Sequence, residues 1–453
     1  MRKFEKRFIL LLLAVLLAAA LTACGGKGGE DAGVTTLTMA SFTSLDRSKK
    51  NLQNAVEQFN REHPDIQIEL QDYYGEDYQT AAQNRDRLLT EITAGRGPDI
   101  IDLGSAGLPV QQLALRGYLE DLWPYIDSDP ELGRESLLEA PLKSSEVNGG
   151  LYLAFDSVMI YTLVGAERIV GDRTGWTLEE LQEAFAAMPE GSTVMEAYQT
   201  KEDLLYYVLS MCLGSYVDWD SGQCGFDCAS FRTVMEFINS FPEQSGIDWS
   251  SWETVQRINE ETIRRQREGR QMLSQTVLSN PCQIQKFDGS WGGASFVGFP
   301  MGNGSVGSVF SLSETKLAMS AGCKNKDAAW AFIRQTMLPK YGGTAAVDYF
   351  NSNIPVNRDD YEMIKSMSAQ EDTFAYRTMT VGDAQVEMHA VTEAEMQRFE
   401  NLLNSIEMVD LYDRDLFTIV KDASGPYFSG DKSLDETVAL IQNRVQLYVN
   451  EQL

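Results

Sequence analysis

The chain is poor in the residues that usually build metal and nucleophile sites. Its 453 residues include only two histidines, His63 and His389, and six cysteines. Cys224 and Cys228 have a C-x3-C spacing, but no histidine stands near them in the sequence. The sequence therefore predicts no metal and no cofactor. We expect the cysteines after residue 24 to be small buried residues, with room for one disulfide.

Enzyme motifs are also missing. The sequence contains no H-E-x-x-H zinc motif and no P-loop, and Asn303 interrupts the G-x-S-x-G pattern around Ser305. A surface glycoside hydrolase with paired carboxylates stays an alternative, although 66 acidic residues place some pairs together by chance. We expect a protein that is not an enzyme and has no catalytic residues.

Positive charge is scarce as well. Lysine and arginine total 38 against 66 aspartate and glutamate residues, so the formal net charge is −28. Such an acidic surface repels phosphate backbones, and nucleic acid is therefore not an expected partner. Hydrophobic residues make up 43% of the chain, which is typical of globular proteins. A chain of this length is longer than a single hydrophobic core usually supports, so the length predicts two lobes.

The longest apolar run, Phe8–Ala23, follows a basic start and is too short for a confident membrane span. Leu21–Cys24, followed by two glycines, resembles a bacterial lipobox. The resemblance implies a lipoprotein signal peptide over residues 1–23 and a diacylglycerol anchor on Cys24. Residues 24–33 then form a flexible tether. An ordinary signal peptide, with the cysteine incidental, is the alternative.

Hydrophobic periodicity changes repeatedly between two and 3.6 residues after the tether. Val34–Phe42 alternates as a strand does, and Asp46–Glu62 carries apolar residues at helical spacing. The pattern continues with predicted strands at 66–70 and 99–103 and predicted helices at 78–93 and 108–116. This β-α-β-α-β order is typical of parallel strands joined by crossover helices.

The later segments predict a second unit. Gly149–Thr162 is a continuous strand-like run that leads into it, and Thr177 with Glu180 forms a capping box at a helix start. Residues 217–226 predict a hairpin, and residues 287–308 predict a loop with a short strand. Further helices are predicted over 231–241, 324–338 and 434–451.

Seven segments, taken in order, resemble the motifs of one family. The family is the extracellular solute-binding proteins of family 1, the maltose-binding-like receptors of ABC importers, and the segments are Val56–Asn60 with His63–Ile66, Ala94–Ile101, Gly117–Leu122, Ser320–Gln335, Ile354–Asn357, Tyr427–Ser433 and Ile441–Arg444. The resemblance implies an α/β, periplasmic-binding-protein-like fold: two parallel-sheet lobes joined by a hinge, with a ligand cleft between them. It places residues 34–154 and 311–349 in lobe 1 and residues 155–310 and 350–453 in lobe 2.

The resemblance also implies a function. The protein would be a monomer on the extracellular face of the cell membrane, held by its lipid anchor. It would capture a small solute, a carbohydrate first of all, and deliver it to the transmembrane subunits of an ABC permease. A surface sensor or adhesin that keeps the cleft is the alternative. Residues 102–106 lack the aromatic residue of the maltose-binding pattern, which argues against maltodextrin itself.

Ligand sites in open parallel sheets lie beyond the carboxyl ends of the strands. Aromatic rings can cover the C–H faces of a sugar, and carboxylates and amides can bond its hydroxyls. Each candidate has a packing, turn or capping role as its alternative. The candidates in the loops after the strands, at the crossover and in the second lobe are Phe42, Tyr73, Tyr74, Ser105, Asp156, Trp219, Asn280 and Trp291.

Overall fold

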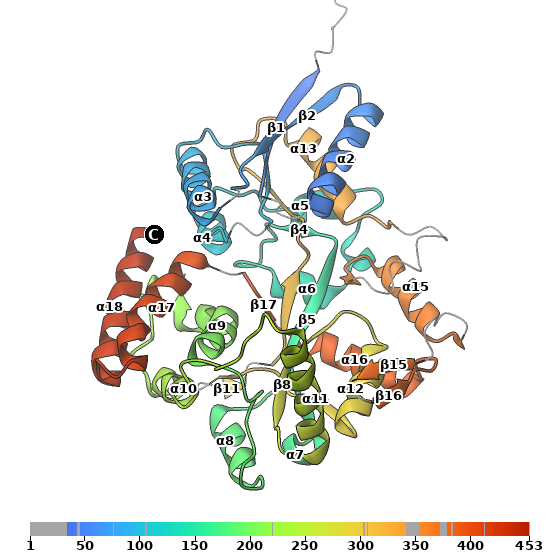
Figure 1. The fold of residues 1–453 in the computed structure, drawn as a ribbon. Coiled ribbons are helices and arrows are strands. Elements are labelled where there is room, and N and C mark those ends of the chain that lie inside the picture. The colour runs from blue at the N-terminus through green and yellow to red at the C-terminus, as the bar shows by residue number, and fades with distance from the viewer. Residues whose placement is uncertain are drawn as a thin grey trace, which may run out of the picture.

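A computed structural model describes residues 34–42, 46–75, 77–104, 107–219, 221–301, 304–305, 307–340, 353–371, 378–381, 384–411 and 413–452. Two β-sheets lie one above the other, each with helices packed around it (Figure 1). This arrangement confirms the α/β prediction. The predicted signal peptide, the tether with Cys24, and Ser105 lie outside the described residues.

The first sheet contains the parallel unit that the periodicity predicts. Its strands, in spatial order, are β2 (Ile66–Asp72), β1 (Thr35–Ser41), β3 (Ile100–Asp102), β13 (Lys316–Met319) and β4 (Ala154–Phe155). β1 is parallel to both β2 and β3, whereas β13 is antiparallel to β3 and β4. The carboxyl ends of β1, β2 and β3 therefore lie at one edge of the sheet.

The predicted helices over 46–62, 78–93 and 108–116 are found close to those bounds around the first sheet, whereas the helices over 123–128 and 139–144 were not predicted. Asp77 caps one of them by accepting a hydrogen bond from the Thr80 amide over 2.8 Å. The helices are α2 (Asp46–Glu62), α3 (Tyr78–Thr93), α4 (Val110–Leu115), α5 (Trp123–Ser128), α6 (Glu139–Ser144) and α13 (Lys326–Ile333).

The second sheet departs from the predicted parallel arrangement. Its strands are β5 (Ser157–Ala166), β8 (Leu273–Leu278), β9 (Ala294–Phe296), β12 (Val309–Leu312), β14 (Ile354–Pro355) and β17 (Met408–Val409). β5 is antiparallel to four of the others, and only β12 and β17 form a parallel pair. The strands around β5 are short and are not joined by single crossover helices, so the βαβ rule does not apply to them.

Helices also surround the second sheet. The predicted capping box of Thr177 and Glu180 is confirmed at the start of α8. The predicted loop over 287–308 is wrong in its first part, because residues up to Trp291 are helical. The helices are α7 (Glu167–Val170), α8 (Leu178–Ala186), α9 (Lys201–Cys212), α10 (Ala229–Asn239), α11 (Trp252–Glu268), α12 (Gln283–Trp291), α15 (Arg358–Ser368), α16 (Glu393–Asn404), α17 (Arg414–Phe428) and α18 (Leu434–Gln452).

Three two-stranded ribbons complete the described elements. The predicted hairpin over 217–226 is confirmed as the first of them. The pairs are β6 (Val217–Asp218) with β7 (Gln223–Cys224), β10 (Pro300–Met301) with β11 (Gly304–Ser305), and β15 (Thr378–Val381) with β16 (Ala384–Glu387).

The chain passes between the two sheets at Asp156, at residues 313–315 and again between β13 and β14, and the first two of these places are neighbours. β4 and β5 are separated by Asp156 alone, so the predicted continuous strand over 149–162 is divided there. Residues 313–315 connect β12 of the second sheet to β13 of the first. The Ser313 amide donates to the Ser157 carbonyl over 2.9 Å, so the two crossings are hydrogen-bonded side by side.

Two large apolar clusters form the core. One contains fully buried residues of β1, such as Leu37 and Met39, and extends to Ile160 on one face of β5. The other contains Leu163 on the opposite face of β5 together with Trp176 and the inner faces of α10, α17 and α18. Burial on both faces fixes β5, and with it the second sheet, as the rigid base for the loops that follow its strands.

Candidate functional site

Polar side chains gather at the edge where β1, β2 and β3 end. The Ser41 hydroxyl donates to the Asp102 carboxylate over 3.3 Å, and the Gly104 amide donates to the same carboxylate over 3.3 Å. Asp102 is fully buried, so its carboxyl group depends on these donors rather than on water. These hydrogen bonds therefore fix the Asp102 side chain at this edge.

The aromatic residues after β1 and β2 adopt different roles at this edge. Phe42 and Tyr73 are buried and their ring centroids lie 5.7 Å apart. Burial and the hydrogen bond to Glu91 raise the pKa of Tyr73 to about 12. Tyr74 is 38% exposed, and the Lys49 ammonium lies 5.9 Å from its ring centroid. Of the three predicted rings, Tyr74 is the one that a solute can cover.

Lys316, the first residue of β13, connects this edge to the second sheet. Its amide donates to Asp102 over 3.4 Å, and its ammonium donates to the Ser313 carbonyl over 3.2 Å. Burial lowers the pKa of the Lys316 ammonium, and the carboxylates of Asp102, Asp410 and Glu314 oppose that shift. The lysine thus stands between acidic groups from both sheets.

Asp410 follows β17 and supplies the acidic group from the second sheet. Burial raises the pKa of its carboxyl to about 6, and Lys316 opposes the rise. Its Oδ1 atom is buried and accepts no hydrogen bond from any described residue. Because an unsatisfied buried acceptor costs about 1–3 kcal/mol, this oxygen is prepared to accept a donor from outside the protein.

The charge of Asp410 acts on two tyrosines, one in β5 and one in α9. Burial and then the charge of Asp410 raise the pKa of Tyr161 in β5 and of Tyr206 in α9. Tyr206 is 47% exposed. We call Asp102, Lys316, Asp410, Tyr161 and Tyr206 the central polar cluster.

Helices from both sheets meet beside the central polar cluster. In Figure 1, α17 and α18 lie below α3 and α4 at the left of the molecule. Arg85 of α3 donates to both carboxylate oxygens of Asp415 in α17, over 2.8 and 2.9 Å, and its side chain is only 8% exposed. Its Nε and Nη1 atoms have no partner among the described residues.

A second contact joins the same helices. Asp413, which caps α17, accepts hydrogen bonds from Gln112 of α4 over 3.0 Å and from the Tyr448 hydroxyl of α18 over 3.0 Å. Burial raises the pKa of the Asp413 carboxyl, and these donors oppose the rise. Together with Arg85 and Asp415, these groups fix how closely the two sheets approach on this side.

The sequence profile of the bacterial extracellular solute-binding proteins matches residues 43–257 of the chain. This part of the chain, just under half of its length, is similar to that family. No curated protein matches the chain.

Solved structures of solute-binding proteins share the fold. A periplasmic oligogalacturonide-binding protein from Yersinia enterocolitica is 14% identical with a TM-score of 0.54, covering 92% of this chain and all of its own. The sugar-binding protein MalE from Xanthomonas citri is 16% identical with a TM-score of 0.53, covering 92% of this chain and 98% of its own. A designed cysteine esterase has a TM-score of 0.53 at 15% identity, with the same coverages. At these identities the likeness shows the periplasmic-binding-protein fold and nothing about activity.

Four predicted site residues, Trp219, Trp291, Asn280 and Asp156, are not members of the central polar cluster. Trp219 and Trp291 are 8% and 1% exposed and belong to the two apolar clusters. The ring of Trp219 packs edge-on against Tyr448. Asn280 is buried, and its carbonyl accepts a hydrogen bond from Gln283 at the start of α12.

Asp156, the fourth of these, lies at the sheet crossing. Its carboxylate accepts hydrogen bonds from the Lys340 ammonium over 2.7 Å and the Ser157 hydroxyl over 2.9 Å. Burial favours a higher pKa for Asp156, but these partners outweigh it, so its pKa is lowered. Its contacts tie the crossing segments together, and its side chain is 30% exposed.

Sequence reasoning missed Lys316, Asp410 and Tyr206. The signal for Asp410 is a polar residue directly after a short apolar run, Met408–Val409, which is the strand-end rule applied to a segment that we did not predict as a strand. Lys316 begins β13, and Tyr206 lies in α9, which was not predicted.

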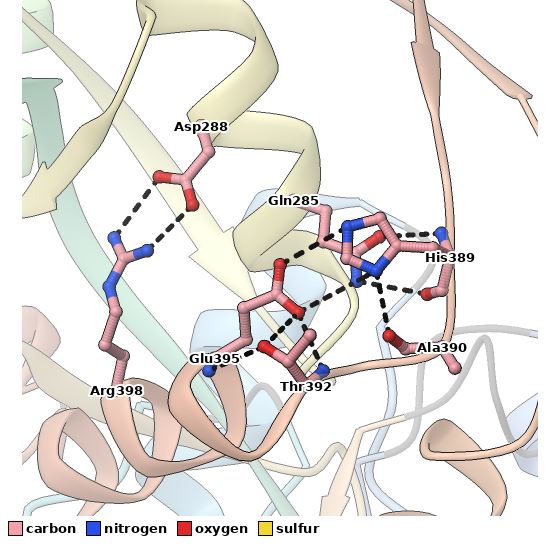
Figure 2. Close-up of polar contacts among 7 residues, drawn as sticks. All are labelled: Gln285, Asp288, His389, Ala390, Thr392, Glu395 and Arg398. Carbon is pink, nitrogen blue, oxygen red and sulfur yellow. Dashed lines mark hydrogen bonds and ion pairs between the residues drawn. The ribbon is translucent and has the colours of Figure 1, made fainter.

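The histidine near the C-terminal third belongs to a structural network (Figure 2). Gln285 of α12 donates to the His389 carbonyl over 3.1 Å and to Glu395 over 3.3 Å. Glu395 in turn completes the capping box of Thr392 at the start of α16. The polar contacts drawn in Figure 2 lie among α12, α16 and the segment before α16, so we assign this network to packing.

The described residues contain no group of three histidine, cysteine, aspartate or glutamate side chains arranged to hold a metal ion. No helix among them has the length and apolar character needed to cross a membrane. Cys224, Cys228, Cys282 and Cys323 carry free thiols.

Proposed function

We propose that this solute-binding protein captures a carbohydrate outside the cell and delivers it to an ABC importer. The observation that carries the proposal is the buried Oδ1 atom of Asp410, which has no donor among the described residues. A sugar hydroxyl is a donor of suitable strength, and the tyrosines of the central polar cluster offer ring faces and further hydroxyls. The Yersinia protein binds an oligogalacturonide and the Xanthomonas protein binds a sugar, which supports a carbohydrate ligand here.

The proposal includes two lobes that close around the solute. We assign residues 34–154 and 311–349 to lobe 1 and residues 155–310 and 350–453 to lobe 2. The change of sheet at Asp156 and at 313–315 supports the boundaries at 154/155 and 310/311 to within a few residues. Two adjacent crossings are suited to act as a hinge, and the central polar cluster takes residues from both sides of it.

We further propose that the mature protein is a monomer held at the extracellular face of the membrane by lipid on Cys24. The lipobox resemblance supports the anchor, and the glycine-rich tether gives the domain freedom to reach the transmembrane subunits of a permease.

Replacing Cys24 with serine is expected to release the protein from the cell. A serine cannot form the thioether to diacylglycerol, so radiolabelled palmitate incorporation should fall to background and the protein should appear in the medium. Fractionation and palmitate labelling of cells expressing the full chain would measure this. A Cys323→Ser variant, which changes a buried thiol of the folded domain, should keep label and location. Retained label in the first variant would contradict the anchor.

A thermal-shift screen of sugars, peptides and polyamines against the purified protein tests the central claim. Any ligand of the native state adds RT ln(1 + [L]/Kd), or about 2.7 kcal/mol at a hundredfold excess over Kd. We expect a carbohydrate to raise the melting temperature. Stabilisation only by peptides or polyamines, or by nothing, would contradict the proposal. Loss of uptake of that sugar on deletion of the gene would separate the importer from a sensor or adhesin.

Incubation with oligosaccharides separates binding from hydrolysis. We expect chromatography to show unchanged sugar. Cys282, at the start of α12, is 3% exposed, and burial raises the pKa of its thiol to about 12, so it is a poor nucleophile. Released products would instead support a glycoside hydrolase.

A further inference from the structure

Three buried side-chain oxygens close to the start of β8 have no hydrogen-bond donor among the described residues. They are Oε2 of Glu196 and the Oε1 atoms of Gln199 and Gln271. The three residues are 8%, 7% and 0% exposed, so bulk water does not supply the missing donors. Native proteins leave few buried acceptors unsatisfied, and a group of three therefore points to a bound partner.

Backbone hydrogen bonds hold the segment before Glu196 against the part of the chain that carries Gln271. Thr193 and Gln271 form a parallel bridge, and the Leu273 amide donates to the Val194 carbonyl over 2.9 Å. Glu196 comes two residues after Val194, so this pairing places Glu196 beside the first residues of β8.

A turn and side-chain hydrogen bonds complete the arrangement. The Gln199 amide donates to the Glu196 carbonyl over 3.0 Å, which folds the chain back after Glu196. The Ser274 hydroxyl oxygen accepts hydrogen bonds from the side-chain amides of Gln266 and Gln271, each over 2.8 Å. Burial raises the pKa of the Glu196 carboxyl. The Ser274, Gln199 and Gln271 side chains lie beside that carboxyl and oppose the rise.

The described groups around Glu196 carry no compensating positive charge. The side chains that act on its carboxyl are a hydroxyl and two amides, with no lysine, arginine or histidine among them. Arg265 of α11 is joined to the same segment, but its Nη2 atom donates to the carbonyls of Gly191 and Arg270 over 2.9 and 3.1 Å. A buried carboxylate is stable only when a partner or an ion balances its charge.

We propose that the side-chain oxygens of Glu196, Gln199 and Gln271 bind a monovalent alkali cation. A proton on the carboxyl would give one hydrogen bond and leave the other acceptors unsatisfied, whereas a hard cation is coordinated by several oxygens at once. One carboxylate balances one positive charge, and a divalent ion would leave a buried charge unpaired. The bound ion would hold the connection between α8 and α9 against β8 and the end of α11.

Thermal unfolding of the purified wild-type protein in different salts tests the site. The probes are NaCl, KCl and choline chloride at equal ionic strength and neutral pH, with CaCl2 as the divalent comparison. Choline is too large to enter a buried site, so it controls for ionic strength. We expect NaCl or KCl to raise the melting temperature by about 2–3 °C over choline chloride, since an ion in excess of its Kd stabilises the folded state.

Three variants locate the ion. Glu196→Gln keeps the shape of the side chain and removes its charge, so its melting temperature should be the same in all three monovalent salts. Gln199→Leu keeps the carboxylate and removes one neutral oxygen, so about tenfold more alkali ion should be needed for half of the shift. Glu183→Gln, at an exposed position of α8, is the matched control and should respond to the salts as the wild type does.

Three results would overturn the site. The first is one melting temperature for the wild type in NaCl, KCl and choline chloride, which a protonated carboxyl or a buried water would give. The second is an alkali shift that persists unchanged in Glu196→Gln or, if that variant does not fold, in Gln199→Leu. The third is stabilisation by CaCl2 alone, which would exclude a monovalent ion. No solute is present in these measurements, so their failure would leave the proposed function unaffected.

Discussion

Replacing Asp410 with alanine is expected to weaken carbohydrate binding by about 10- to 150-fold. A hydrogen bond to a charged acceptor contributes about 1.5–3 kcal/mol, and each 1.4 kcal/mol is a factor of ten in Kd. The Oδ1 atom has no donor among the described residues, so the free protein loses little when it is removed. Titration calorimetry of the sugar found in the screen would measure the loss. Asp422→Ala, on an exposed position of α17, is the matched control and should bind as the wild type does.

The same carboxyl predicts how binding depends on pH. With a pKa of about 6, Asp410 is charged at pH 7.5 and largely protonated at pH 5. If the charged form accepts the sugar hydroxyl, affinity falls as pH falls, by about tenfold one unit below the pKa. Asp410→Asn should bind weakly at both values, with no such dependence. An affinity that rises on acidification, or a pH effect that persists in the asparagine variant, would exclude this role.

Replacing Asp415 with asparagine is expected to lower the free energy of unfolding by about 3 kcal/mol. The substitution leaves the Arg85 guanidinium, whose side chain is 8% exposed, with only the outer carboxylate of Asp86 at 3.2 Å. Stranding a buried charge costs about 3–5 kcal/mol, and Asp86 offsets part of that cost. Urea unfolding followed by circular dichroism would measure the change.

Two variants establish that the cost comes from the stranded charge. Asp86→Asn removes the partner that is 66% exposed and should cost less than about 1 kcal/mol. Arg85→Met combined with Asp415→Asn should be more stable than Asp415→Asn alone, because no unpaired charge is then buried. Equal stability of Asp415→Asn and the wild type would show that the contact between α3 and α17 contributes nothing to folding.

The first sheet could be predicted from the sequence because its signals are local. The helices over 46–62 and 78–93 have those bounds in the structure, since apolar spacing and the stops at His63-Pro64 and Gly95 lie within each segment. The rule that ligands lie beyond strand ends also selected Phe42, Tyr73 and Tyr74, which lie together at one edge.

The second half of the site could not be predicted in this way. Trp219 and Trp291 stand among turn residues and glycines, where an aromatic residue can equally be exposed or buried, and only the packing of distant segments decides. Lys316 and Asp410 are separated by more than ninety positions and meet because β13 and β17 belong to different sheets that the chain brings together. No local periodicity encodes such an encounter.

The position of β13 determines when the first sheet can be completed during synthesis. β13 lies between β3 and β4, although it follows β3 by more than two hundred residues. A nascent chain that has emerged only as far as β4 has an open hydrogen-bonding edge on β3 and no neighbour for β4. Such pairing of distant strands is slow, so the amino-terminal half must wait unfinished until the ribosome has made most of the protein.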